Sequence, residues 1–175
     1  MAEYNPRLAV YPGTFDPLTR GHMSLIFRGL RLFDNVIFAV ADSTPKHTCF
    51  TWEERVEMAR ATFASEPRII VEGFHGLLMD YVEHRGAGAI LRGLRAVSDF
   101  EYEFQMALMN RRLSREVQTV FLMTDYNWMY LSSTIVKEVA LNGGNVKGLV
   151  SEPVLTKLTE KYQFMLNEGK GEPRP

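Results

Sequence analysis

Short apolar, β-branched runs alternate with helical patterns along the whole chain, and this alternation limits the folds that the sequence can adopt. Five of these runs predict strands, at residues 8–11, 36–40, 69–71, 89–91 and 119–122. Several are too apolar to leave one face in water, which is typical of parallel strands covered on both sides. We therefore predict an α/β fold in a single domain: an open sheet of five parallel strands with helices on both faces.

Capping patterns mark several helix boundaries. Thr51 with Glu54, and Ser98 with Glu101, each place a hydroxyl three residues before a carboxylate, which predicts two helix starts. Gly86 follows a basic helical end and predicts a left-handed C-cap, after which a strand should resume. Further helices are expected over residues 133–141 and 153–166, in a domain that covers residues 1–167 and ends in a disordered tail, 168–175.

The composition excludes several classes of protein. The chain has 20 Lys and Arg against 21 Asp and Glu, so no overall basic field favours nucleic acid or an anionic membrane as a partner. Cys49 is the only cysteine and cannot close an intramolecular disulfide; we expect it to pack as a small residue, not to act as a nucleophile. No apolar run approaches the roughly 20 residues of a spanning helix, and the first seven residues lack a signal-peptide core. We expect a cytoplasmic protein with no membrane span.

Several common catalytic motifs are missing from the sequence. It has no Walker A motif, no nucleophile elbow, no zinc-protease helix and no paired cysteine ligands. The glycines of residues 86–88 lack the third glycine of a dinucleotide-binding turn and precede a strand instead of following one. We therefore expect no metal site built by the protein, and the chemistry must lie in another segment.

That segment is YPGTFDPLTRGH, residues 11–22, between the first strand and the first helix. Open parallel sheets bind ligands at the carboxyl ends of their strands, and this turn follows what should be a central strand. His22 falls at the start of the helix, where N–H groups and the helix dipole favour phosphate. The alternative is a turn shaped by prolines with a histidine cap. The combination of Thr14, Gly13, Gly21 and His22 favours a phosphate site.

The sequence Gly13-Thr14-Phe15-Asp16-Pro17, followed by Gly21-His22, resembles the signature of the adenylyl- and cytidylyltransferase superfamily, which has a Rossmann-like fold. Residues 92–95, 99–103 and 131–134 are similar to segments of the bacterial phosphopantetheine adenylyltransferases, and the resemblance covers residues 8–166. It implies reversible transfer of the adenylyl group of ATP to 4′-phosphopantetheine. The products would be dephospho-coenzyme A and pyrophosphate, in coenzyme A biosynthesis, with Mg²⁺ on the phosphates.

The resemblance also implies roles for individual residues. The catalytic residues would be His22, which stabilises the transition state, together with Lys46 and Arg92. The acceptor would be bound by Thr14, Lys46, Leu78 and Arg92. The nucleotide would be bound by Thr14, Phe15, His22, Gly93, Leu94, Arg95, Glu103, Trp128, Met129, Tyr130, Leu131, Ser132, Ser133 and Thr134.

Some of these residues have simpler explanations. Lys46 lies in a polar loop and can be an ordinary solvated lysine, Glu103 can be a solvated charge on a helix, and Leu78 can belong to the core. Ser132, Ser133 and Thr134 stand at a predicted helix start. A plain N-cap needs one hydroxyl, so three in a row favour a second phosphate site.

The helix after Ser98 carries apolar residues on more than one face: Phe100, Tyr102, Phe104, Met106, Leu108 and Met109. This pattern predicts a homo-oligomer, although burial within the same domain is an alternative. The resemblance implies a homohexamer and feedback inhibition by coenzyme A. Two other functions stay open: a sister enzyme acting on nicotinate mononucleotide or on glycerol phosphate with CTP, and a nucleotide sensor without turnover. Residues 92–103 favour the pantetheine enzyme, and the intact Thr14 and His22 argue against a sensor.

Overall fold

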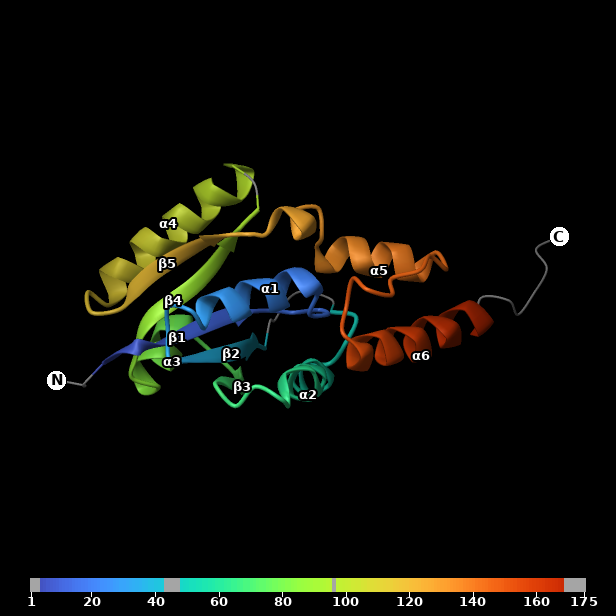
Figure 1. The fold of residues 1–175 in the computed structure, drawn as a ribbon, viewed down its shortest axis with the longest axis horizontal. Coiled ribbons are helices and arrows are strands. Elements are labelled where there is room, and N and C mark those ends of the chain that lie inside the picture. Colours follow the sequence, from blue (N-terminus) through green and yellow to red (C-terminus); the bar gives the residue numbers. More distant parts are fainter. Residues whose placement is uncertain (1–3, 43–47, 96, 169–175) are drawn as a thin grey trace.

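A computed structural model describes residues 4–42, 48–95 and 97–168. Its sheet contains β1 (Asn5–Gly13), β2 (Asn35–Ala41), β3 (Ile69–Phe74), β4 (Ala87–Leu94) and β5 (Gln118–Met123). All neighbouring strands are parallel, in the order β3-β2-β1-β4-β5 (Figure 1). Each strand contains one of the five predicted runs, so the predicted open parallel sheet is confirmed, with β1 at its centre.

Helices cover both faces of this sheet. They are α1 (Arg20–Gly29), α2 (Trp52–Phe63), α3 (Leu78–His84), α4 (Val97–Leu113), α5 (Ser133–Leu141) and α6 (Glu152–Glu168). One buried cluster joins the sheet to α1 and α2 and continues into α5 and α6, whereas a second cluster lies against α3 on the other face. Like α3, α4 packs on that second face, against β4 and β5. The two clusters are what hold the sheet between two helical layers, because buried apolar area is the main stabilising contribution.

Most of the predicted helix boundaries are confirmed. The Thr51 hydroxyl accepts from the Glu54 N–H at 3.2 Å, and the Glu54 carboxylate accepts from the Thr51 N–H at 2.8 Å, so α2 begins with the predicted capping box. Gly86 has a φ of 61° after α3, and β4 begins at the next residue, as a left-handed C-cap requires. Helix α5 has the predicted bounds, and α6 extends the predicted helix by one residue at its start and two at its end.

The predicted cap at Ser98 is wrong. Helix α4 begins at Val97, so Ser98 lies inside the first turn and not in front of it. The Asp99 carboxylate accepts from the Arg95 N–H at 3.3 Å and from Arg95 Nε at 3.2 Å, and it holds the entry to the helix. A carboxylate near a helix N-terminus is also favoured by the helix dipole.

The C-terminal end of the described chain is helical. The predicted tail begins at Glu168, which is the last residue of α6, and its remaining residues, 169–175, lie outside the described part of the chain. Within the described ranges, every helix is too short or too polar to cross a bilayer.

The strand order places a crevice beside β1. From β1 the chain moves outward to β2 and β3 on one side, and then returns to place β4 on the other side of β1. The connections after β1 and β4 therefore leave in opposite directions. Ligands of open α/β sheets bind at such a point, outside the carboxyl ends of the two strands.

Candidate active site

A cleft of about 330 Å³ opens at the carboxyl ends of β1 and β4, where the topology places a crevice. The β1–α1 turn, the end of β4 and the segment that leads into α5 form most of its lining, and Glu103 of α4 and Thr124 after β5 complete it. Most of the residues that the sequence proposed are brought together here: Thr14, Phe15, His22, Arg92, Gly93, Arg95, Glu103, Trp128, Leu131, Ser132, Ser133 and Thr134. Residues far apart in the sequence thus share one cleft.

Other proposed residues lie elsewhere. Leu94 is buried in the core, and Met129 and Tyr130 are largely exposed just after the short 3-10 helix η1 (Tyr126–Trp128). Leu78 lines a smaller cavity of about 80 Å³, which also touches Arg92 and Glu103. Lys46 lies outside the described residues. The structure therefore joins Leu78 to the cleft only through this charged pair.

His22 is the third residue of α1 and caps its own helix. The Thr19 N–H donates to His22 Nδ1 at 3.0 Å, and the Thr19 hydroxyl lies 3.2 Å from the same nitrogen. A backbone N–H can only donate, so Nδ1 must accept and the ring proton of a neutral His22 is on Nε2. The helix start thus fixes the tautomer of this side chain.

The surroundings of His22 keep it uncharged. Burial lowers the pKa of the imidazole from 6.5 to about 4, and the positive charge of Arg95 acts in the same direction. At neutral pH the ring is therefore a neutral hydrogen-bond donor through Nε2. A histidine can act as a cation or as a neutral donor, and these surroundings favour the neutral donor.

Phe15 packs its ring between His22 and Phe38 and so anchors the turn to the core. Its ring stacks on Phe38 with centroids 3.9 Å apart, and its edge meets the His22 ring at 5.1 Å. Its backbone has a φ of 48°, an unusual value for a residue with a side chain, and the aromatic packing holds it there. A Cβ at Gly13 would lie 2.7 Å from the Phe15 ring, so glycine is required at that position.

Arg92 and Glu103 form one unit. Arg92 Nε donates to Glu103 Oε2 at 2.7 Å, and Arg92 Nη2 donates to Oε1 of the same carboxylate. Arg92 Nη1 also donates to the Pro12 carbonyl at 3.0 Å. Two parallel bonds fix the plane of a guanidinium, so Glu103 orients Arg92 at the edge of the cleft. The sequence placed these residues on different ligands and did not predict that they pair.

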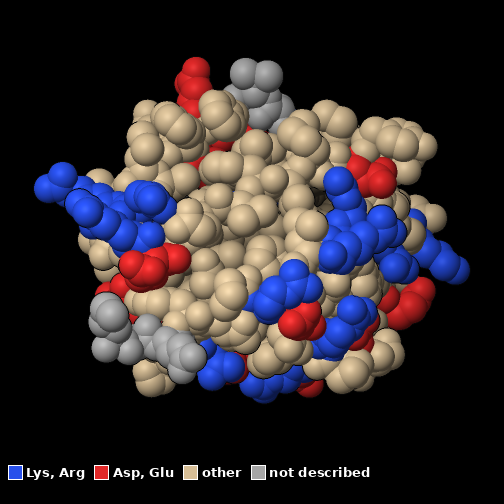
Figure 2. Space-filling model, turned by 60° about the vertical axis from the view of Figure 1, so that its left-hand side comes forward, with Lys and Arg blue, Asp and Glu red and all other residues tan. Residues whose placement is uncertain are grey.

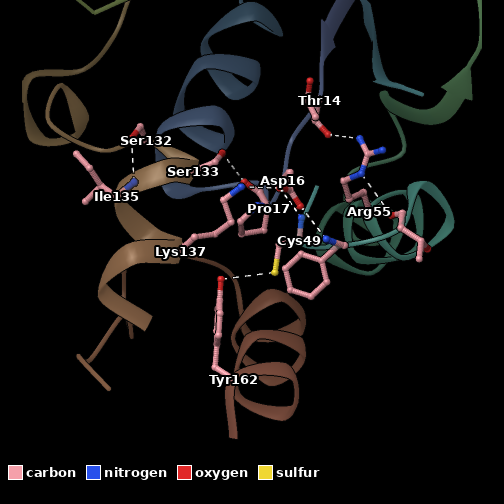
Figure 3. Close-up of polar contacts among 12 residues, drawn as sticks. Thr14, Asp16, Pro17, Cys49, Arg55, Ser132, Ser133, Ile135, Lys137 and Tyr162 are labelled. Carbon is pink, nitrogen blue, oxygen red and sulfur yellow. Dashed lines mark hydrogen bonds and ion pairs between the residues drawn. The ribbon is translucent and has the colours of Figure 1, made fainter. Parts of the chain in front are cut away.

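The start of α5 closes one side of the cleft. Ser132 is its N-cap and accepts from the Ile135 N–H at 3.2 Å, whereas the Ser133 hydroxyl donates to the Pro17 carbonyl at 2.7 Å (Figure 3). The three hydroxyls therefore do not act alike: Ser133 holds the β1–α1 turn. An anion would be drawn to this place chiefly by the helix N-terminus, to which Ser132 and Thr134 add hydroxyl groups.

Three residues around the turn had no predicted role. Arg55 is 2% exposed and donates to the carbonyls of Thr14 at 2.6 Å and Ala41 at 2.9 Å. On the opposite side, Asp16 binds Lys137 (Figure 3). Asp16 lay inside the recognised signature, but neither Arg55 nor Lys137 differs in sequence from an ordinary surface cation. The burial of Arg55 and the pairing of Lys137 with Asp16 are tertiary effects that no local pattern reveals.

Cys49 lies against Tyr162 of α6. Cys49 is half-buried and donates to the Tyr162 hydroxyl at 3.5 Å, which agrees with a packing role. Among the residues that the structure describes, no three His, Cys, Asp or Glu side chains are grouped so that they could hold a metal ion.

Comparison with known proteins shows which family this chain resembles. Residues 10–139 match a protein-family model described as cytidylyltransferase-like. A phosphopantetheine adenylyltransferase of Nitratidesulfovibrio vulgaris is 62% identical over 171 residues, which cover 97% of this chain and 92% of the relative. The enzymes of the same name from Maridesulfovibrio salexigens and Lawsonia intracellularis are 61% and 57% identical. They cover 92% and 93% of this chain and 97% and 94% of their own lengths.

Proposed function

Because the chain belongs to the phosphopantetheine adenylyltransferase family, we propose that the cleft between β1 and β4 is its catalytic site, with His22 as the central donor. The protein transfers the adenylyl group of ATP to 4′-phosphopantetheine, and gives dephospho-coenzyme A and pyrophosphate in coenzyme A biosynthesis. The observation that supports this site best is a neutral, oriented His22 inside a cleft that also contains the start of α5.

The reaction needs no nucleophile from the protein. A phosphate oxygen of the acceptor attacks the α-phosphorus of ATP, the new phosphorus–oxygen bond forms, and the bond to pyrophosphate breaks. The task of the enzyme is to align two polyanions and to stabilise the negative charge that spreads over the phosphate oxygens in the transition state. An uncharged donor such as His22 Nε2–H can donate a hydrogen bond to these phosphate oxygens throughout the reaction without changing its protonation state.

The remaining residues divide between the two substrates in this proposal. Arg92, held by Glu103, contacts the acceptor, with Leu78 at the adjoining cavity and Lys46 on the acceptor phosphate. Thr14 lies between both ligands. The segment that follows Arg92, with Arg95, and the start of α5 bind ATP. Each half of the cleft then contributes positive charge or N–H groups, as two anionic substrates require.

Magnesium enters this scheme as part of the ATP substrate. Glu103 is the only acidic residue among those that line the cleft, and Arg92 occupies both of its oxygens. These residues do not offer a dedicated cage for Mg²⁺, which prefers six oxygen ligands and keeps several waters. We therefore propose that Mg²⁺ is held by the triphosphate and water, where it neutralises the departing pyrophosphate.

The test is pyrophosphate release by the purified protein with Mg-ATP. Three reactions are compared: 4′-phosphopantetheine as acceptor, nicotinate mononucleotide as acceptor, and CTP with glycerol phosphate. Release with phosphopantetheine alone is the expected result. Release only with another pair would keep the site and replace the substrate. ATP binding without release in any reaction would favour a sensor.

A homo-oligomer, specifically a homohexamer, is part of the same proposal. Many apolar side chains of α4 are exposed: Phe100, Tyr102, Phe104, Met106, Leu108, Met109 and Leu113. Figure 2 views the side of the molecule that is on the left in Figure 1, and a broad area there carries neither acidic nor basic residues. The exposed apolar side chains of α4 form the kind of surface that is characteristic of protein interfaces. Light scattering of the purified protein gives the number of chains directly.

Regulation and location complete the proposal. Coenzyme A contains the product of the reaction, so it can compete for the cleft; rising coenzyme A should lower the rate, and added substrate should restore it. A cytoplasmic location agrees with the single cysteine, Cys49. Cell fractionation would test it.

A further inference from the structure

The β1–α1 turn contains a buried carboxylate that the proposed chemistry does not use. Asp16 is 6% exposed and follows Thr14 and Phe15, which line the cleft, but does not line it itself. Figure 3 shows Asp16 between α5 and the segment that leads into α2. A buried carboxylate is unfavourable unless its charge and its oxygens are compensated.

Three donors compensate it. Asp16 Oδ1 accepts from the Phe50 N–H at 2.9 Å, and Oδ2 accepts from the Cys49 N–H at 2.9 Å and from Lys137 Nζ at 2.6 Å. Two of the donors precede α2 and the third lies on α5, so one side chain joins three distant segments. The bond to Lys137 is short and charge-assisted, the strong kind of hydrogen bond.

The same segments hold the turn at neighbouring atoms. On the α5 side, Ser133 donates to the Pro17 carbonyl at 2.7 Å, and Lys137 follows one helical turn later. On the α2 side, Arg55 donates to the Thr14 carbonyl at 2.6 Å. Hydrogen bonds therefore hold the turn from the α5 side and from the α2 side, and Asp16 is bonded to both sides.

We propose that Asp16 is a positioning residue for adenylyl transfer: through Lys137 and the backbone before α2, it sets the turn that carries Thr14 against the start of α5. This inference rests on the proposed function of the cleft. Thr14 and Ser132 both line that cleft, so a shift of the turn changes the alignment of the two substrates. A misplacement of about 1 Å can lower a rate about 10²-fold.

Lys137 acts on the turn and not on a ligand. Its ammonium group is 2.6 Å from Asp16, and Lys137 is absent from the residues that line the cleft. Removal of Lys137 should therefore disturb the geometry of catalysis more than it disturbs the affinity for ATP. This distinction separates a positioning residue from a phosphate-binding lysine.

The first test compares Lys137→Met with Lys137→Arg. Lys137 is partly exposed, so both variants should fold. We expect Lys137→Met to lower kcat about 10- to 100-fold while the Kd for ATP, measured by calorimetry, changes less than about 3-fold. Lys137→Arg keeps the cation and should stay within about 3-fold of wild type. An unchanged kcat in Lys137→Met, or an ATP affinity that falls as much as kcat/KM, would overturn the proposal.

The second test uses Asp16→Asn and the double variant. An asparagine amide would turn its N–H groups toward at least one of the three donors, so kcat should fall at least as much as in Lys137→Met. Because the two residues act as one link, the double variant should lose little more than Asp16→Asn alone, and fully additive losses would contradict the link. If Asp16→Asn does not fold, the Lys137 variants decide the question.

Asp34→Asn is the matched control, because it removes an exposed pair with Arg7 far from the cleft and should leave kcat unchanged. A loss in Asp34→Asn equal to that in Asp16→Asn would overturn the assigned role. Turnover by the wild-type protein distinguishes failure of the proposed function from failure of the positioning role. No pyrophosphate release by wild type with phosphopantetheine would refute the proposed function, and the positioning role with it. Wild-type release together with full release by the Lys137→Met and Asp16→Asn variants would refute the positioning role alone.

Discussion

The β1–α1 turn and the outer face of α4 differ in where their side chains find partners. In the turn, buried polar groups are paired within the chain: Asp16 with Lys137, and the Thr14 carbonyl with Arg55. On α4, apolar side chains such as Leu108, which is 57% exposed, extend into solvent in the single chain. The turn is thus complete in one copy, whereas α4 has a surface suited to a second copy.

This difference indicates that catalysis and assembly depend on different parts of the sequence. Chemistry at the cleft depends on geometry that the chain builds alone, so it should respond to single side chains inside the turn and the Arg92–Glu103 pair. Assembly depends on area and should respond to a charge placed on α4. Substitutions can therefore test each region without disturbing the other.

Among the substitutions that compare the two regions, the largest effect is expected from Glu103→Gln. The amide keeps the shape but turns an N–H group toward the Arg92 guanidinium, so the guanidinium loses its fixed plane. We expect kcat/KM for phosphopantetheine to fall about 100-fold with little change in the Kd for ATP. A loss confined to ATP affinity would instead mean that Glu103 contacts the nucleotide directly. Glu101→Gln, on the exposed side of the same helix, is the matched control.

The next effect concerns pH and His22. Its pKa is about 4 when folded and near 6.5 when unfolded, so the unfolded chain binds more protons between these values. Protonation of His22 in the unfolded chain therefore does not lower the free energy of unfolding above about pH 6.5, but it lowers this free energy increasingly as the pH drops toward 4. Between pH 5 and 6.5, wild type should gain about 1.5 kcal/mol more than His22→Asn in urea unfolding. Parallel curves would show that His22 titrates normally.

Leu108→Asp tests the other region. A buried charge would disrupt an interface made by α4, whereas the same charge in water costs the single chain little. Light scattering should show a smaller assembly, with an unfolding free energy within about 1 kcal/mol of the separated wild-type chain. An unchanged assembly would place the interface elsewhere.

The smallest effect is expected at Asp34→Asn, where the lost pair with Arg7 is exposed. Surface ion pairs contribute about 0–1 kcal/mol, so its thermal midpoint should barely move. A large drop would mean that exposed and buried pairs contribute alike in this protein, which would remove the contrast between the turn and the surface.

Local patterns predicted most of the fold. The five strands follow from apolar runs, and the start of α2 follows from Thr51 and Glu54, because capping is a local interaction. The start of α4 was misplaced because the helix begins at Val97 and Asp99 binds Arg95 at its first turn, which the Ser98–Glu101 spacing does not reveal. Such competition between nearby side chains is decided by geometry that a spacing rule does not contain.

The site was predictable only where residue type and strand end coincide. His22 follows β1 and Arg92 lies near the carboxyl end of β4, so topology brings them together without further information. The pairing of Arg92 with Glu103, and the burial of Arg55, depend on how helices pack across the sheet. The neutral state of His22 also depends on packing, since burial sets its pKa.

The central claim is that His22 acts as a neutral Nε2 donor in the cleft, and His22→Asn tests it most directly. The asparagine oxygen can replace Nδ1 as the acceptor for the Thr19 N–H, but the Nε2 donor is lost. We predict an ATP Kd within about 3-fold of wild type and pyrophosphate release with phosphopantetheine at least about 100-fold slower. Release at the wild-type rate would contradict the account.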